Sequence, residues 1–222
     1  MIIAIDGPAG AGKSTVAKRL ADQLGFLYID TGAMYRALTL KILDNKIDFE
    51  NIERIIEVAR NTKIELVTDK TSITKVILDD VDVSLAIRQP RVTQSVSLIA
   101  KIKEVRQIMV CLQRRIAEKQ NCILDGRDIG TVVFPNAQKK FYIDASFSER
   151  VKRRYLDLIN LGVKDVSYEQ VAEDLRNRDT IDSTRDIAPL RRAPDAIYID
   201  TTNLTIEEVV QKMLEEIKKQ DG

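Results

Sequence analysis

Residues 7–14, which read GPAGAGKS, constrain the fold of this chain more than any other stretch. They match the pattern G-x-x-x-x-G-K-[ST] of a phosphate-binding loop. The apolar residues 2–5 before them suit a buried strand, and residues 16–24 after them carry apolar side chains at helical spacing. Glycines let such a loop curl until its N–H groups point inward, and the helix N-terminus adds partial positive charge. The sequence therefore predicts a strand, a phosphate-binding loop and a helix in that order.

Two side chains of this loop predict its chemistry. Lys13 is placed to reach the β- and γ-phosphates of a nucleotide, and the hydroxyl of Ser14 to ligate Mg²⁺. The alternative is a glycine-rich turn with an incidental Lys-Ser pair. The flanking strand and helix argue against that alternative, because the motif acquires its meaning from them.

Length and composition narrow the class of protein. The 222 residues suit one α/β domain with a small insertion, and 35 basic against 34 acidic residues give no global field that favours nucleic acid or membrane. The absence of histidine excludes imidazole catalysis and histidine metal sites. Cys111 and Cys122 lack CxxC spacing, which indicates reduced thiols. We expect a cytoplasmic monomer without a signal peptide, a membrane span, or a nucleic-acid or membrane partner.

The pattern along the chain predicts an α/β fold with a five-stranded parallel sheet flanked by helices. The five strands are expected at residues 2–5, 26–29, 121–125, 140–144 and 196–200. Helices are expected at residues 33–43, 51–60, 90–119, 148–161, 168–178 and 205–219. Residues 63–67 and 74–78, joined by a turn at 69–72 and with 81–83 as a candidate third segment, indicate a small antiparallel β insertion. The core strands all lead into charged loops, where open α/β sheets bind ligands.

A second motif, NKID at residues 45–48, matches the guanine-reading NKxD signature of GTPases. That signature should follow a late core strand, whereas this copy follows a helix about thirty residues after the loop, and no DxxG switch motif accompanies it. We interpret it as a polar loop.

Charged residues gather near the predicted strand ends. The arginines that several loops could bring together are Arg36, Arg106, Arg127, Arg150, Arg153, Arg154, Arg178 and Arg185. A guanidinium suits phosphate because its planar fork donates two hydrogen bonds at once, although any one of these residues taken singly reads as a solvated surface charge. Asp125 ends a core strand, where a carboxylate can support Mg²⁺ through water or bond the loop serine, or can simply be a turn residue before Gly126.

Four motifs together resemble the bacterial cytidylate kinases, and the resemblance covers essentially the whole chain. They are GPAGAGKS at 7–14, DTGAMYR at 30–36, DGRDIGTVVFP at 125–135, and Arg178-Asp179, Asp182, Arg185 and Ala188-Pro189-Leu190 near the C-terminus. The loop alone identifies only a superfamily, whereas the second and third motifs are far more specific. Ser14 stands where some members have glycine or threonine.

The resemblance implies Mg²⁺-dependent transfer of the ATP γ-phosphoryl group to CMP or dCMP. It implies a core at about 1–30 and 120–222, a monophosphate-binding region at about 31–118 that contains the insertion, and a short helical lid at about 150–165. ATP would be bound by Gly7, Pro8, Ala9, Gly10, Ala11, Gly12, Lys13, Ser14 and Thr15. The acceptor would be bound by Thr31, Arg36, Ser97, Arg106, Arg127, Asp128, Arg178, Asp182 and Arg185. The catalytic residues would be Lys13, Arg127, Arg150 and Arg154, with Ser14 on the metal.

The chemistry of cytosine agrees with this reading. Its N4 amino group donates, so a carboxylate such as Asp128 complements it, whereas uracil would face that carboxylate with an acceptor. Arg178 and Asp182, four residues apart, are expected to share a helix face and to act on the acceptor's sugar, with Arg178 orienting the Asp182 carboxylate toward a 3′-hydroxyl. A surface ion pair of about 0.3–0.5 kcal/mol is the alternative.

Three other functions stay open from the residues alone. They are another small-molecule kinase of the adenylate or shikimate type, a nucleotide-dependent switch, and a nucleic-acid-dependent ATPase. The DGRD run and the β insertion argue against the first, the missing switch motif against the second, and the balanced charge against the third.

Overall fold

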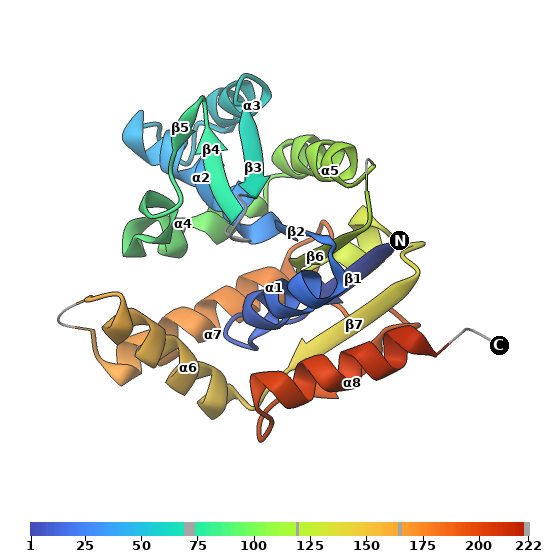
Figure 1. The fold of residues 1–222 in the computed structure, drawn as a ribbon. Helices are drawn as coiled ribbons and strands as arrows, with labels where there is room; N and C mark the ends of the chain where they lie inside the picture. The colour runs from blue at the N-terminus through green and yellow to red at the C-terminus, as the bar shows by residue number, and fades with distance from the viewer. Residues whose placement is uncertain (69–73, 119, 164–165, 220–222) are drawn as a thin grey trace.

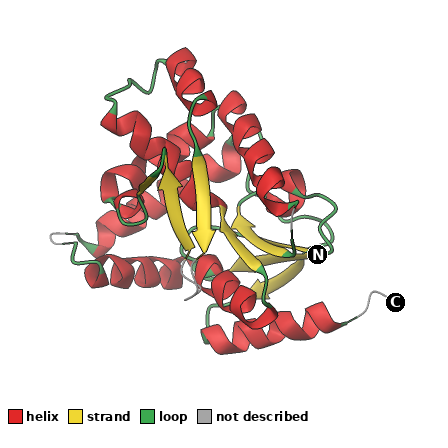
Figure 2. Cartoon of the chain, turned by 45° about the horizontal axis from the view of Figure 1, so that its top comes forward, coloured by secondary structure: helices red, strands yellow, loops and turns green. Residues whose placement is uncertain are grey.

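A computed structural model describes residues 1–68, 74–118, 120–163 and 166–219. The turn expected at 69–72 lies outside the described residues, as do residues 164–165 of the expected lid. Figures 1 and 2 show two separate sheets surrounded by helices.

The larger sheet has five parallel strands in the order β2-β6-β1-β7-β8 (Figure 1). Their bounds are β1 Ile2–Asp6, β2 Leu27–Asp30, β6 Cys122–Gly126, β7 Lys139–Asp144 and β8 Ile197–Asp200. These strands read as near-continuous apolar runs because helices cover a parallel sheet on both faces. The five predicted core strands are therefore confirmed, each within about two residues.

Two hydrophobic clusters hold helices against the sheet. On one face, Ile3, Phe141 and Ile199 pack with residues of α1 (Lys13–Leu24) and α8 (Ile206–Lys218). On the other, Ala4 and Leu124 join a larger cluster with α2 (Thr31–Asp44), α4 (Pro90–Ala100) and α5 (Lys103–Ala117). In the described ranges, no helix is both long and apolar enough to cross a membrane.

The predicted β insertion forms a separate antiparallel sheet. After α3 (Ile52–Arg60) the chain makes β3 (Ile64–Thr68), β4 (Thr74–Leu78) and the short β5 (Val81–Asp82), in that spatial order. A 3₁₀ turn, Ala86–Arg88, then leads into α4. Ile64, Val76 and Leu78 pack into the same cluster as α2, so the insertion is fixed against that helix.

Two helical predictions were wrong in extent. The continuous helix expected at 90–119 is broken at Lys101 and Ile102 into α4 and α5. Helix α7 (Tyr168–Thr184) runs six residues beyond its expected end at Arg178, while α6 (Phe147–Asn160) matches its prediction closely. The predicted cap of α8 is confirmed, because Thr205 accepts from the Glu208 N–H in a capping box.

A buried carboxylate connects the end of β1 to the chain after β6. Asp6 is 3 % exposed and accepts hydrogen bonds from the backbone N–H groups of Ile129 and Gly130, each at 2.7 Å. Those N–H groups belong to a π-helical turn, Ile129–Val133, that the sequence analysis did not anticipate. The loop that carries Arg127 and Asp128 is thereby tied to the strand that enters the phosphate loop.

Replacing Asp6 with alanine should lower the free energy of unfolding by about 1–3 kcal/mol, because two buried N–H groups lose their acceptor. Denaturant unfolding would measure the loss. The matched control is Asp82→Ala: Asp82 also accepts two hydrogen bonds, from the N–H and hydroxyl of Ser84, but in an exposed position where water can replace it. Equal losses in both variants would contradict a special role for the buried carboxylate.

Candidate active site

The phosphate loop joins β1 to α1 at the centre of the sheet, and its glycines are required by close packing. A Cβ atom on Gly7 would lie 1.9 Å from the carbonyl oxygen of Ile143. Gly10 has φ +77°, and a Cβ there would lie 2.9 Å from the carbonyl oxygen of Arg150. A side chain at either position would force the loop away from β7 or α6.

Lys13 begins α1 and is almost fully buried, at 5 % exposure. Its Nζ donates to the Pro8 carbonyl at 2.6 Å, which holds the ammonium across the loop. Burial and the neighbouring Arg127 guanidinium lower the pKa of Lys13 well below its usual range. Phosphate oxygens would offset both effects, so the loop is electrostatically suited to an anion.

Asp125 has contacts on both carboxylate oxygens. Oδ2 accepts from the Ser14 hydroxyl at 2.7 Å, and Oδ1 accepts from the Tyr28 hydroxyl at 2.9 Å. The hydroxyl of Thr31 donates to the Asp125 carbonyl at 2.6 Å. Burial, with Asp30 opposite it in the neighbouring strand, raises the pKa of Asp125 to about 6. Of the interpretations open for Asp125, the structure favours the bond to the loop serine.

The residues around Ser14 fit a magnesium ion. Mg²⁺ prefers oxygen ligands and usually keeps several waters, bound by one or two protein groups and substrate phosphates. Ser14 and the carboxylate behind it supply such oxygens. In the ranges that the structure covers, no cluster of three or more histidine, cysteine, aspartate or glutamate side chains could form an all-protein metal cage.

A cleft of about 1380 Å³ opens over the phosphate loop and extends to the β insertion. It is lined by loop residues 9–15, by the start of α2, by the insertion, and by parts of α4, α6 and α7. All of the residues expected to bind the acceptor line it: Thr31, Arg36, Ser97, Arg106, Arg127, Asp128, Arg178, Asp182 and Arg185. Of the residues expected to bind ATP, those from Ala9 to Thr15 line it, whereas Gly7 and Pro8 are not among its lining residues.

Arg106 and Asp128 form a buried ion pair in the wall of this cleft. An Arg106 Nη2–Asp128 Oδ2 hydrogen bond joins them, with both side chains under a tenth exposed. Arg106 Nη1 also donates to the Ala100 carbonyl at 2.9 Å, at the break between α4 and α5. The orientation of the guanidinium is therefore fixed, and with it one edge of the Asp128 carboxylate.

The expected pairing of Arg178 with Asp182 does not occur. Asp182 Oδ2 accepts from Arg127 Nε at 2.8 Å, and Oδ1 lies 3.6 Å from Arg185 Nη1. Burial opposes ionisation of Asp182, but Arg127, Arg178 and Arg185 together hold the pKa of its carboxyl below the usual value.

Arg178 is the cation of this group without a counterion at contact distance. Its Nε is buried and, among the described residues, has no hydrogen-bond partner. Burial and the adjacent Arg127 lower the pKa of Arg178 to about 9. A polar group that is buried and unpaired is costly, so an anionic ligand would satisfy this side chain.

The three arginines expected near the lid separate in the structure. Arg153 and Arg154 line the cleft, and Arg153 is held by the Thr201 carbonyl at 2.7 Å. Arg150 is not among the described residues that line the cleft. It lies beneath the phosphate loop, where Nη1 donates to the Ala9 carbonyl at 3.0 Å and to Asp179 Oδ2 at 2.5 Å.

Several cleft residues were missed in the sequence analysis. Tyr28 holds Asp125, Arg88 projects from the insertion, and Asp157 follows the lid arginines. Tyr28 lies within a strand that was recognised, so its position two residues before Asp30 was an available signal. Arg88 carried none, since it lies in a short 3₁₀ turn without a motif. The NKID motif is confirmed as a loop between α2 and α3, and none of its residues is among the described residues lining the cleft.

Comparison with solved structures supports the fold. An uncharacterized protein from Eubacterium ventriosum ATCC 27560 matches with a TM-score of 0.52 at 13% identity, covering 99% of each chain. At that identity the likeness concerns the architecture alone.

Sequence relatives are much closer. A family model described as cytidylate kinase matches residues 3–219. The chain is 56% identical to the cytidylate kinase of Caldanaerobacter subterraneus subsp. tengcongensis, covering 98% of this chain and 94% of that protein. It is 48% identical to the cytidylate kinase of Fusobacterium nucleatum, covering 99% and 98%. The chain therefore belongs to the cytidylate kinase family.

Proposed function

We propose that this enzyme transfers the γ-phosphoryl group of ATP to CMP or dCMP, with Mg²⁺, giving ADP and CDP or dCDP. The observation that carries the proposal is that a single cleft contains both the phosphate loop and the Arg106–Asp128 pair. One end suits a nucleoside triphosphate and the other the edge of a cytosine, so donor and acceptor can meet in it.

On the donor side, loop N–H groups and Lys13 bind phosphate oxygens, and Arg127 and Arg154 both line the cleft. Bound Mg²⁺, held by Ser14, would neutralise charge on the β- and γ-phosphates. The acceptor nucleophile is already a phosphate oxygen, so no side chain need act as a strong base. Positioning and neutralisation by the chain's cations can supply most of the rate enhancement.

On the acceptor side, Arg36 and Arg127 bind the phosphate, while Ser97, Arg106 and Asp128 read the base. The Asp128 carboxylate accepts from cytosine N4 and would meet the O4 acceptor of uracil. Asp182 and Arg185, whose Oδ1 and Nη1 atoms lie 3.6 Å apart, bind the sugar. Arg178, whose Nε has no hydrogen-bond partner among the described residues, supplies a further positive charge to the cleft.

We further propose the division of labour that the family resemblance implies. Residues 31–118 form the acceptor region and about 150–165 a lid, both of which contribute to the cleft around a core of residues 1–30 and 120–222. We also propose a cytoplasmic monomer, and the balanced charge of the chain argues against nucleic-acid and membrane partners.

An acceptor panel with ATP and Mg²⁺ tests this function. ADP release should be fast with CMP and dCMP, at least tenfold slower in kcat/KM with UMP, and near background with AMP, GMP and shikimate. Lys13→Ala should abolish nearly all turnover, because one lost transition-state charge contact costs about 3 kcal/mol or more. Preference for any acceptor other than a cytidine monophosphate would refute the proposal.

Replacing Asp128 with asparagine should erode the discrimination against uracil. An amide can donate to O4, so the ratio of kcat/KM for CMP over UMP should fall about tenfold, the equivalent of one mispaired polar group. Steady-state kinetics with both acceptors measures the ratio. Asp157→Asn is the matched control: it removes a charge from the same cleft, on α6, and should leave the ratio unchanged. An unchanged ratio in the Asp128 variant would remove Asp128 from base reading.

Replacing Asp182 with asparagine should raise KM for CMP and dCMP alike, by about tenfold, as expected for loss of a charge-assisted hydrogen bond. The KM for ATP should stay within twofold. Thermal unfolding of the same variant is the companion measurement. A KM increase confined to CMP would move the contact to the 2′-hydroxyl, and a lower Tm with normal acceptor kinetics would leave Asp182 a purely structural partner of Arg127.

A further inference from the structure

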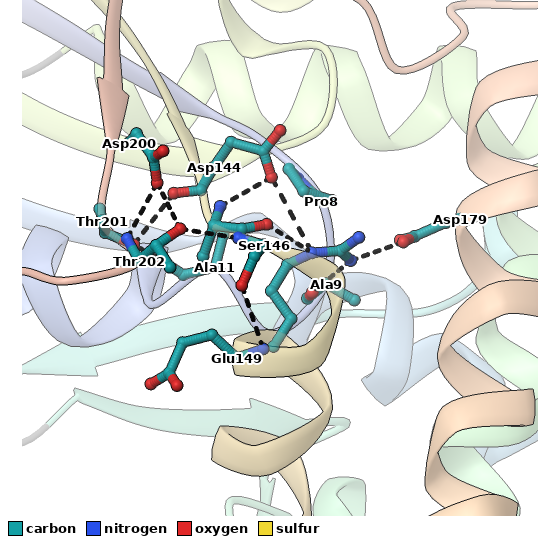
Figure 3. A network of polar contacts seen from close by, with 12 residues as sticks. Pro8, Ala9, Ala11, Asp144, Ser146, Glu149, Asp179, Asp200, Thr201 and Thr202 are labelled. Atoms are coloured by element: carbon teal, nitrogen blue, oxygen red, sulfur yellow. Dashed lines mark hydrogen bonds and ion pairs between the residues drawn. The ribbon is translucent and has the colours of Figure 1, made fainter.

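The guanidinium of Arg150, in the first turn of α6, donates hydrogen bonds to three oxygen atoms beneath the phosphate loop. Nη1 donates to the Ala9 carbonyl at 3.0 Å and to Asp179 Oδ2 at 2.5 Å, and Nε donates to the Ala145 carbonyl at 3.2 Å. Figure 3 shows Ala9 and Asp179 approached by the same guanidinium, with Asp179 on a neighbouring helix. The side chain of Arg150 is 10% exposed, so these contacts occupy a site that water hardly reaches.

The loop is packed directly on the helices that provide these contacts. Ala9 lies in a small hydrophobic cluster with Val151 and Leu158 of α6 and Val171 and Leu175 of α7. The close approach of Gly10 to the Arg150 backbone, described above, belongs to the same contact. The geometry of α6 and α7 is therefore transmitted to the loop without an intervening layer.

The Ala9 carbonyl determines where one loop N–H points. The C=O and N–H of a trans peptide point in opposite directions, and the described chain has no cis peptide. Holding the Ala9 oxygen toward Arg150 therefore directs the Gly10 N–H away from α6. Rotation of this peptide would instead turn a carbonyl oxygen toward the phosphates.

Asp179 supplies the charge that keeps Arg150 in this position. Its Oδ2 is the nearest carboxylate oxygen to Arg150, since Asp144 Oδ1 lies 3.9 Å from Nε. The Phe147 ring also packs against this guanidinium, with its centroid 5.3 Å from Arg150 Cζ, and Arg176 Cζ lies 5.1 Å from the same centroid. Asp179 follows Arg178 directly in the chain but, unlike it, is not among the described cleft-lining residues.

We propose that Asp179 is a positioning residue for the phosphate loop, acting through Arg150, which holds the Ala9 carbonyl and so aims the Gly10 N–H at the donor's phosphates. The inference rests on the proposed binding of ATP at this loop. It also replaces the expected contact of Arg150 with the transferring phosphoryl group. Helix α7 thus serves both sites: Arg178 and Asp182 face the acceptor, and Asp179 sets the donor loop.

Calorimetric titration of ADP with Mg²⁺, without acceptor, tests the proposal in the full chain. The variants are Arg150→Lys, Asp179→Asn and the double variant. Arg150→Lys keeps the charge, but a single ammonium cannot reproduce the fork that spans Ala9, Ala145 and Asp179. Each single variant should raise the Kd of ADP about tenfold. The double variant should be no worse than the single ones, because the two side chains act as one unit.

The matched control is Arg176→Lys, which alters the second cation that packs on the Phe147 ring and should leave the Kd within twofold. Three results would overturn the proposal. They are additive losses in the double variant, a lower Tm with unchanged ADP affinity in Asp179→Asn, and reduced turnover with unchanged ADP affinity in Arg150→Lys. If Asp179→Asn does not fold, Asp179→Glu replaces it under the same criteria. The titration uses no CMP, so its failure is distinguishable from failure of the acceptor panel.

Discussion

Aspartates at the carboxyl edge of the parallel sheet hold the active-site loops in place. Asp6, Asp30, Asp125, Asp144 and Asp200 stand at or next to the ends of the five strands. Each accepts hydrogen bonds from groups in the loops and helices at this edge. Asp6 accepts from Ile129 and Gly130, Asp30 from Ala33 and Arg36, Asp125 from Ser14, Asp144 from Ala145, and Asp200 from Thr202. The site for anionic substrates thus depends on these five carboxylates, which orient hydrogen-bond donors and attract the positively charged side chains of the cleft.

Cations of the site fall into two groups according to whether they already have partners. Arg106 and Arg127 are joined to Asp128 and Asp182, so their orientations are set before any substrate arrives. Lys13 and the Nε of the partly buried Arg178 have weaker compensation, and desolvation lowers the pKa of both side chains. Preset orientation favours selective recognition of the acceptor, whereas uncompensated charge favours strong attraction of phosphate.

Much of this architecture could be predicted because local signals agreed with the fold. Apolar runs gave the strands, and Thr205 gave a helix start. Helix α7 was predicted too short because, beyond Leu175, its only buried side chain is the polar Asp182 and the apolar periodicity ends. The break at Lys101 and Ile102 contains neither proline nor glycine, and the Arg106 side chain donates to the Ala100 carbonyl beside it. Arg150 was expected in the cleft because it lies close in sequence to Arg153 and Arg154. Closeness in sequence does not specify which face of the helix each residue occupies, and Arg150 lies beneath the phosphate loop instead.

The short break between α4 and α5 fixes the spacing of the residues that hold the buried Arg106–Asp128 pair. Arg106 reaches back to the carbonyl of Ala100, the last residue of α4, and forward to Asp128. Only Lys101 and Ile102 separate the two helices, so adding or removing one residue there would change the distance that Arg106 must span to reach the Ala100 carbonyl. A length change that a surface loop would absorb would therefore displace the buried Arg106–Asp128 pair.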